Sequence, residues 1–189
     1  VREKLQLPLD KKLLLFGSVK ISDKRKGIDY LIESCQLLSN KYPEFCKALG
    51  IVVFGKEAEQ YASLFPFPIY SMNYVSNEKE LVDIYNAVDL YVTPSLQDNL
   101  PNTIMEAMAC GVPCVGFNVG GIPEMIDHEC GILVPSEDEA ALANAMLEMI
   151  DNQGGYATET IQKRGTKYTY QNIGKQLSDL YQRVVISAN

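Results

Sequence analysis

Short apolar runs alternate with longer amphipathic stretches along most of this 189-residue chain, and this alternation constrains its fold more than any other feature. Most runs end at a glycine, a proline or a polar residue, which is typical of buried strands. The stretches between them have apolar residues at the three- and four-residue spacing of a helix that packs on one face. Together they predict an α/β fold, a doubly wound, Rossmann-like parallel sheet with helices on both faces.

The elements can be assigned along the chain. Strands are expected at residues 13–16, 51–54, 69–72, 90–93, 112–117 and 131–134. Helices are expected after Gly27, after a capping box of Asn77 and Glu80, at 102–110, in a short turn opened by Pro123, and at 137–150. A polar surface loop is expected at 151–158.

The chain is predicted to form a single domain over residues 1–189, since 47% of its residues are hydrophobic and no linker is visible. Its last part is predicted to be a helical tail over about 158–186, broken near Gly165. An apolar stripe is expected along this tail, at Ile173, Leu177, Leu180 and Val184. Because the chain starts at Val1 and residues 2–12 resemble the beginning of a domain, we expect a piece of a longer protein.

Charge and composition exclude several classes of function. The net charge of −7 argues against general binding to nucleic acid or anionic membranes, because both need an excess of lysine and arginine. No apolar run approaches the roughly 20 residues of a membrane-spanning helix. A zinc site is not expected, because the chain has one histidine and no second cysteine pair. The cysteines are odd in number and have apolar neighbours, so we expect free thiols in a reducing compartment. They are Cys35, Cys46, Cys110, Cys114 and Cys130.

Doubly wound sheets bind ligands at the carboxyl ends of their strands, so the loops after those ends are the candidate binding loops. They follow Phe16, Phe54, Met72, Thr93 and Phe117. The first loop holds four of the chain's 17 basic residues and could bind phosphate, although a solvated loop explains the pattern equally well. These residues are Lys20, Lys24, Arg25 and Lys26.

Glu106 is the only charged residue between Asn99 and Pro123, and it lies in an apolar helix. A buried carboxylate needs hydrogen-bond donors, and the hydroxyls of a sugar or a ribose would suit it. A glutamate on the exposed edge of an ordinary amphipathic helix explains the pattern equally well.

Residues 98–103 open the helix that carries Glu106. A diphosphate could dock on the free N–H groups of a helix start. Asp, Asn and Thr are common helix caps, however, so capping is the preferred interpretation of this segment alone. Gly120 and Gly121 follow another strand and permit close approach to a ligand, although turns also use glycine. The motifs of nicotinamide and P-loop sites are absent.

Taken together, these segments resemble glycosyltransferase family four, a group of retaining enzymes built from two Rossmann-like halves (the GT-B architecture). The resemblance rests on the order and spacing of short motifs along essentially the whole chain. They lie at residues 16–17, 25–27, 53–55, 85–89, 94–95, 106–113 and 120–124, followed by a closing helix at 170–185. The chain is expected to be the C-terminal, nucleotide-sugar-binding half, with the N-terminal acceptor domain absent.

The resemblance implies roles for two acidic residues that have seven residues between them, Asp98 and Glu106. Glu106 is expected to bind the ribose hydroxyls of the donor. Asp98 is expected to act in catalysis, next to the leaving phosphate, where the family usually has a glutamate. Pro101 lacks an N–H and replaces a common glycine, so its contact is expected either to be lost or to be replaced by one from Asn102. Further donor contacts are expected from Asn99, Leu100 and Thr103.

Lys26 is expected to hold the diphosphate and to take part in catalysis. Ser18 is expected among the donor-binding residues, at a position where the family commonly has an arginine, and Lys20 or Arg25 is expected to replace the missing charge. Loop 73–75, with Tyr74 and Val75, is expected to support the base, mostly through its backbone. Gly120 and Gly121 are expected on the sugar side, and neither a metal nor another cofactor is expected.

The implied enzyme is cytoplasmic or peripheral at the inner face of a membrane. It transfers a sugar from a nucleotide-diphosphate-sugar to the hydroxyl of a glycan or lipid-linked acceptor, as in polysaccharide biosynthesis. The isolated domain is expected to be inactive. One alternative is a nucleotide-sugar epimerase or a phosphorylase of the same shape. Another is a non-catalytic nucleotide-binding module, which the departures at Ser18, Asp98 and Pro101 favour.

Overall fold

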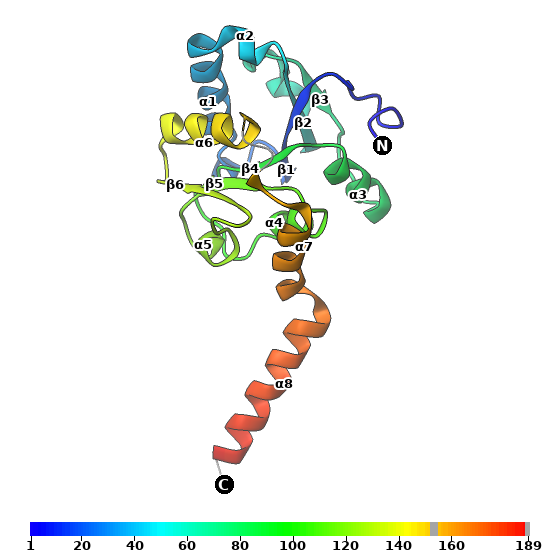
Figure 1. Ribbon diagram of the computed structural model, residues 1–189, viewed down its shortest axis with the longest axis vertical. Coiled ribbons are helices and arrows are strands. Elements are labelled where there is room, and N and C mark those ends of the chain that lie inside the picture. The colour runs from blue at the N-terminus through cyan, green and yellow to red at the C-terminus, as the bar shows by residue number, and fades with distance from the viewer. Residues whose placement is uncertain (152–154, 188–189) are drawn as a thin grey trace.

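The computed structural model describes residues 1–151 and 155–187 and confirms the doubly wound α/β fold (Figure 1). Within these residues, six parallel strands form one sheet in the order β3-β2-β1-β4-β5-β6. The chain order reverses between β1 and β4, and doubly wound folds bind ligands at the carboxyl side of such a reversal. The strands are β1 (Lys12–Lys20), β2 (Leu49–Lys56), β3 (Ile69–Ser71), β4 (Leu90–Thr93), β5 (Cys114–Phe117) and β6 (Gly131–Val134).

Helices cover both faces of the sheet (Figure 1). They are α1 (Ile28–Lys41), α2 (Pro43–Cys46), α3 (Glu78–Asn86), α4 (Asn102–Ala109), α5 (Ile122–Met125), α6 (Glu139–Asp151), α7 (Thr158–Gly165) and α8 (Tyr170–Ser187). Helices α1 and α6 pack together on one face, whereas α3, α4 and α7 cover the other. Alternate residues of β1 divide between the two cores: Leu14 and Phe16 join the first, and Leu13 and Leu15 join the second.

Several predicted bounds were wrong: β2 extends beyond 51–54, β3 ends one residue before 72, and β5 begins two residues after 112. Two further differences, in β1 and α6, have identifiable reasons. Strand β1 does not stop at Gly17 but continues to Lys20. A Cβ on Gly17 would lie 2.0 Å from the Phe54 ring, so this glycine makes room for an aromatic side chain and does not mark a turn. Helix α6 begins at Glu139 and not at Glu137, because Glu137 has a left-handed φ of 62°. The predicted loop at 151–158 lies partly outside the described residues.

The five cysteines are free thiols, and all are buried except Cys110, which is partly buried. Burial raises the pKa of the thiols of Cys35 and Cys114, which therefore stay protonated in the core.

The tail separates into two parts. Helix α7 packs on α4, whereas α8 projects away from the body of the domain (Figure 1). The predicted apolar stripe of α8 is in solvent, with Ile173 39% and Leu180 52% exposed. In the described parts of the chain, no helix has both the length and the apolarity needed to span a membrane.

Candidate functional site

Two loops meet at the carboxyl ends of β1 and β4, where the strand order reverses. The N–H of Leu96, in the loop after β4, donates to the carbonyl of Arg25, in the loop after β1, at 2.7 Å. Gly27 has a left-handed φ of +72°, and a Cβ there would lie 1.8 Å from the carbonyl oxygen of Pro94. Gly27 therefore allows the basic loop to pack closely against the chain that leaves β4.

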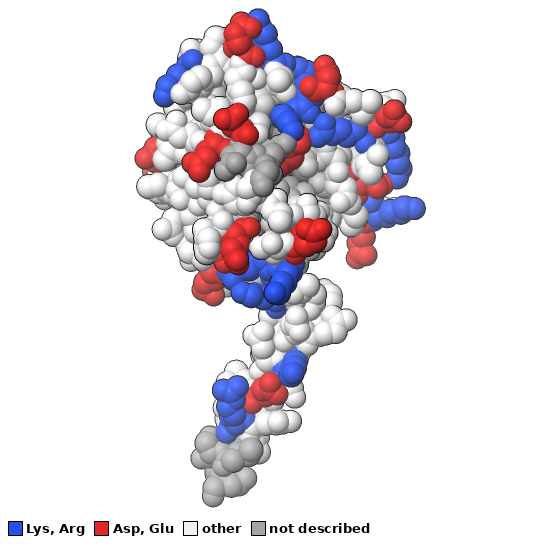
Figure 2. Space-filling model, viewed as in Figure 1, with Lys and Arg blue, Asp and Glu red and all other residues white. Residues whose placement is uncertain are grey.

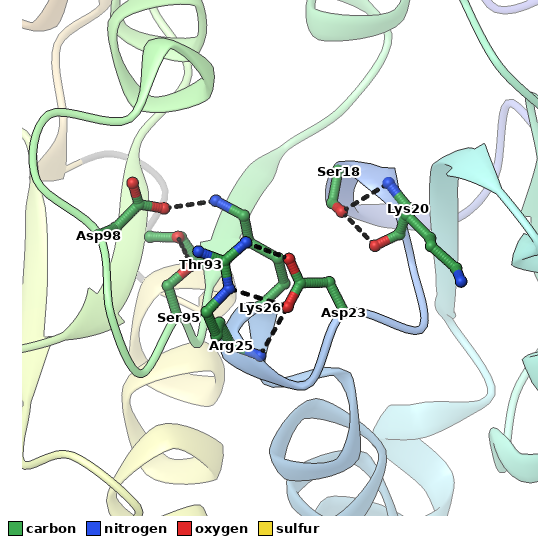
Figure 3. Close-up of polar contacts among 8 residues, drawn as sticks. All are labelled: Ser18, Lys20, Asp23, Arg25, Lys26, Thr93, Ser95 and Asp98. Carbon is green, nitrogen blue, oxygen red and sulfur yellow. Dashed lines mark hydrogen bonds and ion pairs between the residues drawn. The ribbon is translucent and has the colours of Figure 1, made fainter.

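This contact brings together two residues that the sequence assigned to the site. The Nζ of Lys26 donates to Oδ2 of Asp98 at 2.6 Å, and the two side chains are 30% and 17% exposed (Figure 3). The sequence selected both residues but did not predict that they would pair. A lysine and a carboxylate thus face each other beside the start of α4.

Arg25 is held by a residue that the sequence analysis did not single out. Its Nη2 and Nε donate to the Asp23 carboxylate at 2.7 and 3.1 Å, and the backbone N–H of Arg25 donates to the same group at 3.1 Å. These hydrogen bonds lower the pKa of Asp23 and raise that of Arg25. Lys24, in the same 3-10 turn (Lys24–Lys26), is exposed.

The structure does not bring Ser18 and Lys20 to Lys26. The buried Ser18 hydroxyl donates to the carbonyl of Lys20 at 2.6 Å. The Lys20 ammonium lies 3.5 Å from Glu57, and its side chain points away from Lys26 (Figure 3). Of the two candidates for the missing second cation, Arg25 is therefore the one beside the Lys26–Asp98 pair.

The start of α4 lacks the side-chain caps that the sequence favoured. Pro101 occupies the N-cap position, and no side chain among the described residues caps the helix. The capping interpretation of residues 98–103 is therefore wrong, because Asp98 pairs with Lys26 instead. The first-turn N–H groups of α4 thus lack side-chain acceptors, with Asn102 exposed and Thr103 partly buried.

A hollow of about 510 Å³ lies next to this helix start. It is lined by Arg25, Leu96, Gln97, Asp98, Asn99 and Gly120. Gly120 has a left-handed φ of +54°, and a Cβ there would lie 1.9 Å from the carbonyl oxygen of Asp98. Gly121 approaches the carbonyl of Asn99 equally closely, and its N–H donates to the carbonyl of Asp98 at 3.1 Å. The two glycines therefore fit against the backbone of the Asp98 loop.

Glu106 lies in a second hollow on α4. It is partly buried, and its Oε2 accepts a hydrogen bond from the hydroxyl of Tyr85 at 2.9 Å. An exposed helix edge therefore does not describe Glu106. Tyr85 entered the sequence prediction as part of the motif at residues 85–89, and its hydroxyl was the signal that it could be a hydrogen-bond donor. The second hollow is about 440 Å³ and is lined by Asn102, Met105, Glu106, Ala109, Gly165 and residues 168–171.

Loop 73–75 follows β3 and lies against the end of β2. The N–H of Gly55 donates to the carbonyl of Asn73 at 2.7 Å. The ring of Tyr74 is 55% exposed, with the Nζ of Lys56 5.3 Å from its centroid, whereas Val75 is partly buried. The loop and the end of β2 thus present an aromatic ring and a cation at the carboxyl edge of the sheet.

The surface in view shows acidic and basic side chains interspersed (Figure 2). Over residues 1–151 and 155–187, no group of three or more His, Cys, Asp or Glu side chains is arranged to hold a metal ion.

Comparisons with known proteins identify relatives along most of the chain. The family model described as "Glycosyl transferases group 1" matches residues 10–152. An uncharacterized glycosyltransferase of Haemophilus influenzae is 31% identical over 131 residues, which cover 67% of this chain and 36% of that protein. A D-inositol 3-phosphate glycosyltransferase of Corynebacterium urealyticum is 26% identical over 195 residues, or 95% of this chain and 45% of that protein. The chain thus spans less than half the length of these curated relatives.

Solved structures share the fold. Sucrose-phosphate synthase from Thermosynechococcus elongatus superposes with a TM-score of 0.79 at 24% identity, covering 98% of this chain and 48% of the other. HepE of Anabaena, solved in complex with UDP and glucose, gives a TM-score of 0.76 at 20% identity and covers 96% and 51%.

Proposed function

This chain belongs to the group 1 glycosyltransferases, and we propose that it supplies the donor-binding half of a retaining enzyme. In this proposal, the whole enzyme transfers a sugar from a nucleotide-diphosphate-sugar to a hydroxyl of a glycan or lipid-linked acceptor. The acceptor is bound mainly by an N-terminal half that lies outside this chain. The complex of HepE with UDP and glucose supports the class of donor by analogy of fold.

The observation that carries the proposal is the Lys26–Asp98 pair beside the uncapped start of α4. When the sugar is transferred, the bond from its anomeric carbon to the phosphate oxygen breaks, and the diphosphate leaves with the electron pair. A lysine ammonium and the N–H groups of a helix start stabilise this developing negative charge without reorganising. Arg25 lines the hollow beside Asp98 and is proposed to supply a second positive charge, while its guanidinium also pairs with Asp23.

Lys26 pairs with Asp98 in this structure, so a diphosphate must compete with that carboxylate for the ammonium. A diphosphate brings more negative charge than a single carboxylate, so it draws the Lys26 ammonium towards itself. The released Asp98 carboxylate can then accept hydrogen bonds from the donor sugar next to the leaving phosphate. Gly120 and Gly121 lie against the backbone of this loop. They are proposed to line the sugar side.

Glu106 is proposed to hold the ribose. The first hollow is lined by Asp98 and Asn99, and the second by Asn102 and Glu106, so a nucleoside diphosphate is proposed to extend from Asp98 past the start of α4 to Glu106. Asn99, Leu100, Asn102 and Thr103 lie on or beside this path and are proposed to contact the donor. The base is proposed to rest on Tyr74 and Val75.

No cofactor or metal is included, because side-chain cations and helix N–H groups serve the phosphates. We propose that the full-length enzyme acts in the cytoplasm, either free or peripherally bound to the inner face of a membrane.

Binding of nucleoside diphosphates tests the proposal directly. UDP, GDP and ADP are titrated calorimetrically into the 189-residue chain, with and without EDTA. We expect at least one of them to bind, with the same affinity in EDTA. We also expect the isolated chain not to transfer sugar, because acceptor binding needs the other half. Failure of all three nucleotides to bind would contradict a donor-binding role.

Product analysis with the full-length protein separates transfer from the alternatives. A free epimerised nucleotide-sugar or a sugar phosphate would indicate an epimerase or a phosphorylase. Tight nucleotide binding with no turnover of any donor would favour a non-catalytic module, which the departures at Ser18, Asp98 and Pro101 keep open.

A further inference from the structure

Tyr85 reaches from α3 to the carboxylate on α4. Its hydroxyl donates to Oε2 of Glu106 at 2.9 Å, with the carbonyl of Thr103 as a longer partner at 3.2 Å. The Tyr85 side chain is only 1% exposed. Among the described residues, no other side chain or backbone group donates a hydrogen bond to the Glu106 carboxylate.

The ring that carries this hydroxyl is fixed by its surroundings. It makes edge-to-face contacts with Phe54 and Tyr91, each with ring centroids 6.1 Å apart. Such contacts favour one ring orientation in a packed core. Burial, with the negative charge of Glu106 as a smaller cause, raises the pKa of Tyr85 well above its ordinary value. The hydroxyl therefore stays protonated and remains a donor at neutral pH.

We propose that Tyr85 is a positioning residue for the nucleotide ribose, acting through Glu106. A carboxylate can accept about four hydrogen bonds, and Tyr85 uses one of them. By fixing Oε2, Tyr85 sets the orientation of the carboxylate and leaves Oε1 to the ribose hydroxyls. This inference rests on the proposed function, because it assigns Glu106 to the ribose of a nucleoside diphosphate.

A purely structural role for Tyr85 predicts something different. If its hydroxyl only stabilised the core, removing it would weaken the binding of every nucleotide to the same extent. A positioning role instead changes the discrimination between a ribose and a sugar that lacks hydroxyls. The informative quantity is therefore the ratio of affinities for a ribonucleoside diphosphate and its 2′,3′-dideoxy form.

The experiment compares Tyr85→Phe with Tyr91→Phe by calorimetry, using the tightest binder among UDP, GDP and ADP and its dideoxy form. Tyr91 is buried in the same cluster, but among the described residues its hydroxyl makes no hydrogen bond to Glu106. We expect Tyr85→Phe to weaken ribonucleotide binding roughly threefold to tenfold and to leave dideoxynucleotide binding unchanged. We expect Tyr91→Phe to preserve the ratio.

A double-mutant cycle with Glu106→Ala completes the test. In the Glu106→Ala background, Tyr85→Phe should have no further effect on the ratio. An unchanged ratio in Tyr85→Phe, or an effect that persists in the double variant, would overturn the positioning role. If the ratio changes in Glu106→Ala but not in Tyr85→Phe, the proposed function survives and only this inference fails. If the unmodified chain binds no nucleoside diphosphate, both fail.

Discussion

The ammonium of Lys26 lies 2.6 Å from the carboxylate of Asp98, although 72 positions separate the two residues in the chain. Their pairing links the loop after β1 to the loop after β4. It also means that the cation proposed for the diphosphate and the acid proposed for the sugar balance each other's charge.

Replacing Lys26 should lower the affinity for a nucleoside diphosphate, whereas replacing Asp98 should raise it. Lys26→Met removes a charge-assisted contact worth about 1.5–3 kcal/mol, so the affinity for a nucleoside diphosphate should fall roughly tenfold to a hundredfold. Asp98→Asn removes a partly exposed competitor worth up to about 1 kcal/mol, so the affinity should rise by up to about fivefold. Calorimetric titration measures both changes.

Lys24→Met is the matched control for Lys26→Met. It removes the same charge from the same turn, but Lys24 is exposed, whereas Lys26 is partly buried and paired with Asp98. We expect little change in its affinity. If both lysine variants lose affinity equally, the general charge of the loop holds the phosphate and the specific contact of Lys26 does not.

Glu106→Ala should lower nucleoside diphosphate affinity about tenfold or more, because hydrogen bonds to a charged group are lost. The free energy of unfolding should fall only slightly, by about 1 kcal/mol or less, because the Tyr85 hydroxyl keeps the Thr103 carbonyl as a hydrogen-bond partner. Melting temperature and affinity are measured on the same protein. Unchanged affinity with a clearly lower melting temperature would refute the ribose assignment.

Gly120→Ala should destabilise the domain by about 1–3 kcal/mol, because the new Cβ would overlap the Asp98 carbonyl at a left-handed φ. Gly174→Ala is the control, since a Cβ there meets no atom within 4 Å in helix α8. Alanine should support that helix by up to about 1 kcal/mol. Urea unfolding followed by near-ultraviolet circular dichroism compares the variants. Equal stability of both variants would contradict the close approach at Gly120.

The Asp23–Arg25 contact should persist to acidic pH. Hydrogen bonds from Arg25 hold the pKa of Asp23 below its ordinary value of 3.8. A carboxyl whose pKa is lowered on folding contributes stability above its unfolded pKa and loses it as the pH falls through the folded pKa. The carboxyl carbon shift of Asp23 in NMR should therefore titrate below pH 3.8. A midpoint above 3.8 would show that the contact is absent in solution.

The sequence predicted the parts of the fold that depend on local pattern. Strands β4 and β6 have the predicted bounds, because each apolar run ends at its own turn residue. The predicted end of β1 before Gly17 was wrong, because this glycine leaves room for the Phe54 ring of the neighbouring strand. A glycine required by a distant side chain looks the same in sequence as a glycine required by a turn.

The candidate site was predictable as residues but not as contacts. Lys26, Asp98 and Glu106 were selected by residue type, position and resemblance, yet their partners come from other elements. Whether Asp98 caps α4 or pairs with Lys26 depends on how closely two loops approach, which Gly27 decides. The hydrogen bond from the Tyr85 hydroxyl to Glu106 likewise depends on the packing of α3 against α4.

Helix α8 has a consequence for how the stability of this chain is measured. All its side chains from Tyr170 to Val185 are exposed, so it gains little from the packed body of the domain. An isolated helix of 18 residues is only marginally stable in water. Its amides should exchange with deuterium far faster than those of β1, as a separate cooperative unit. Far-ultraviolet melting curves would then contain two transitions, and a single two-state fit would misstate the free energy of the sheet.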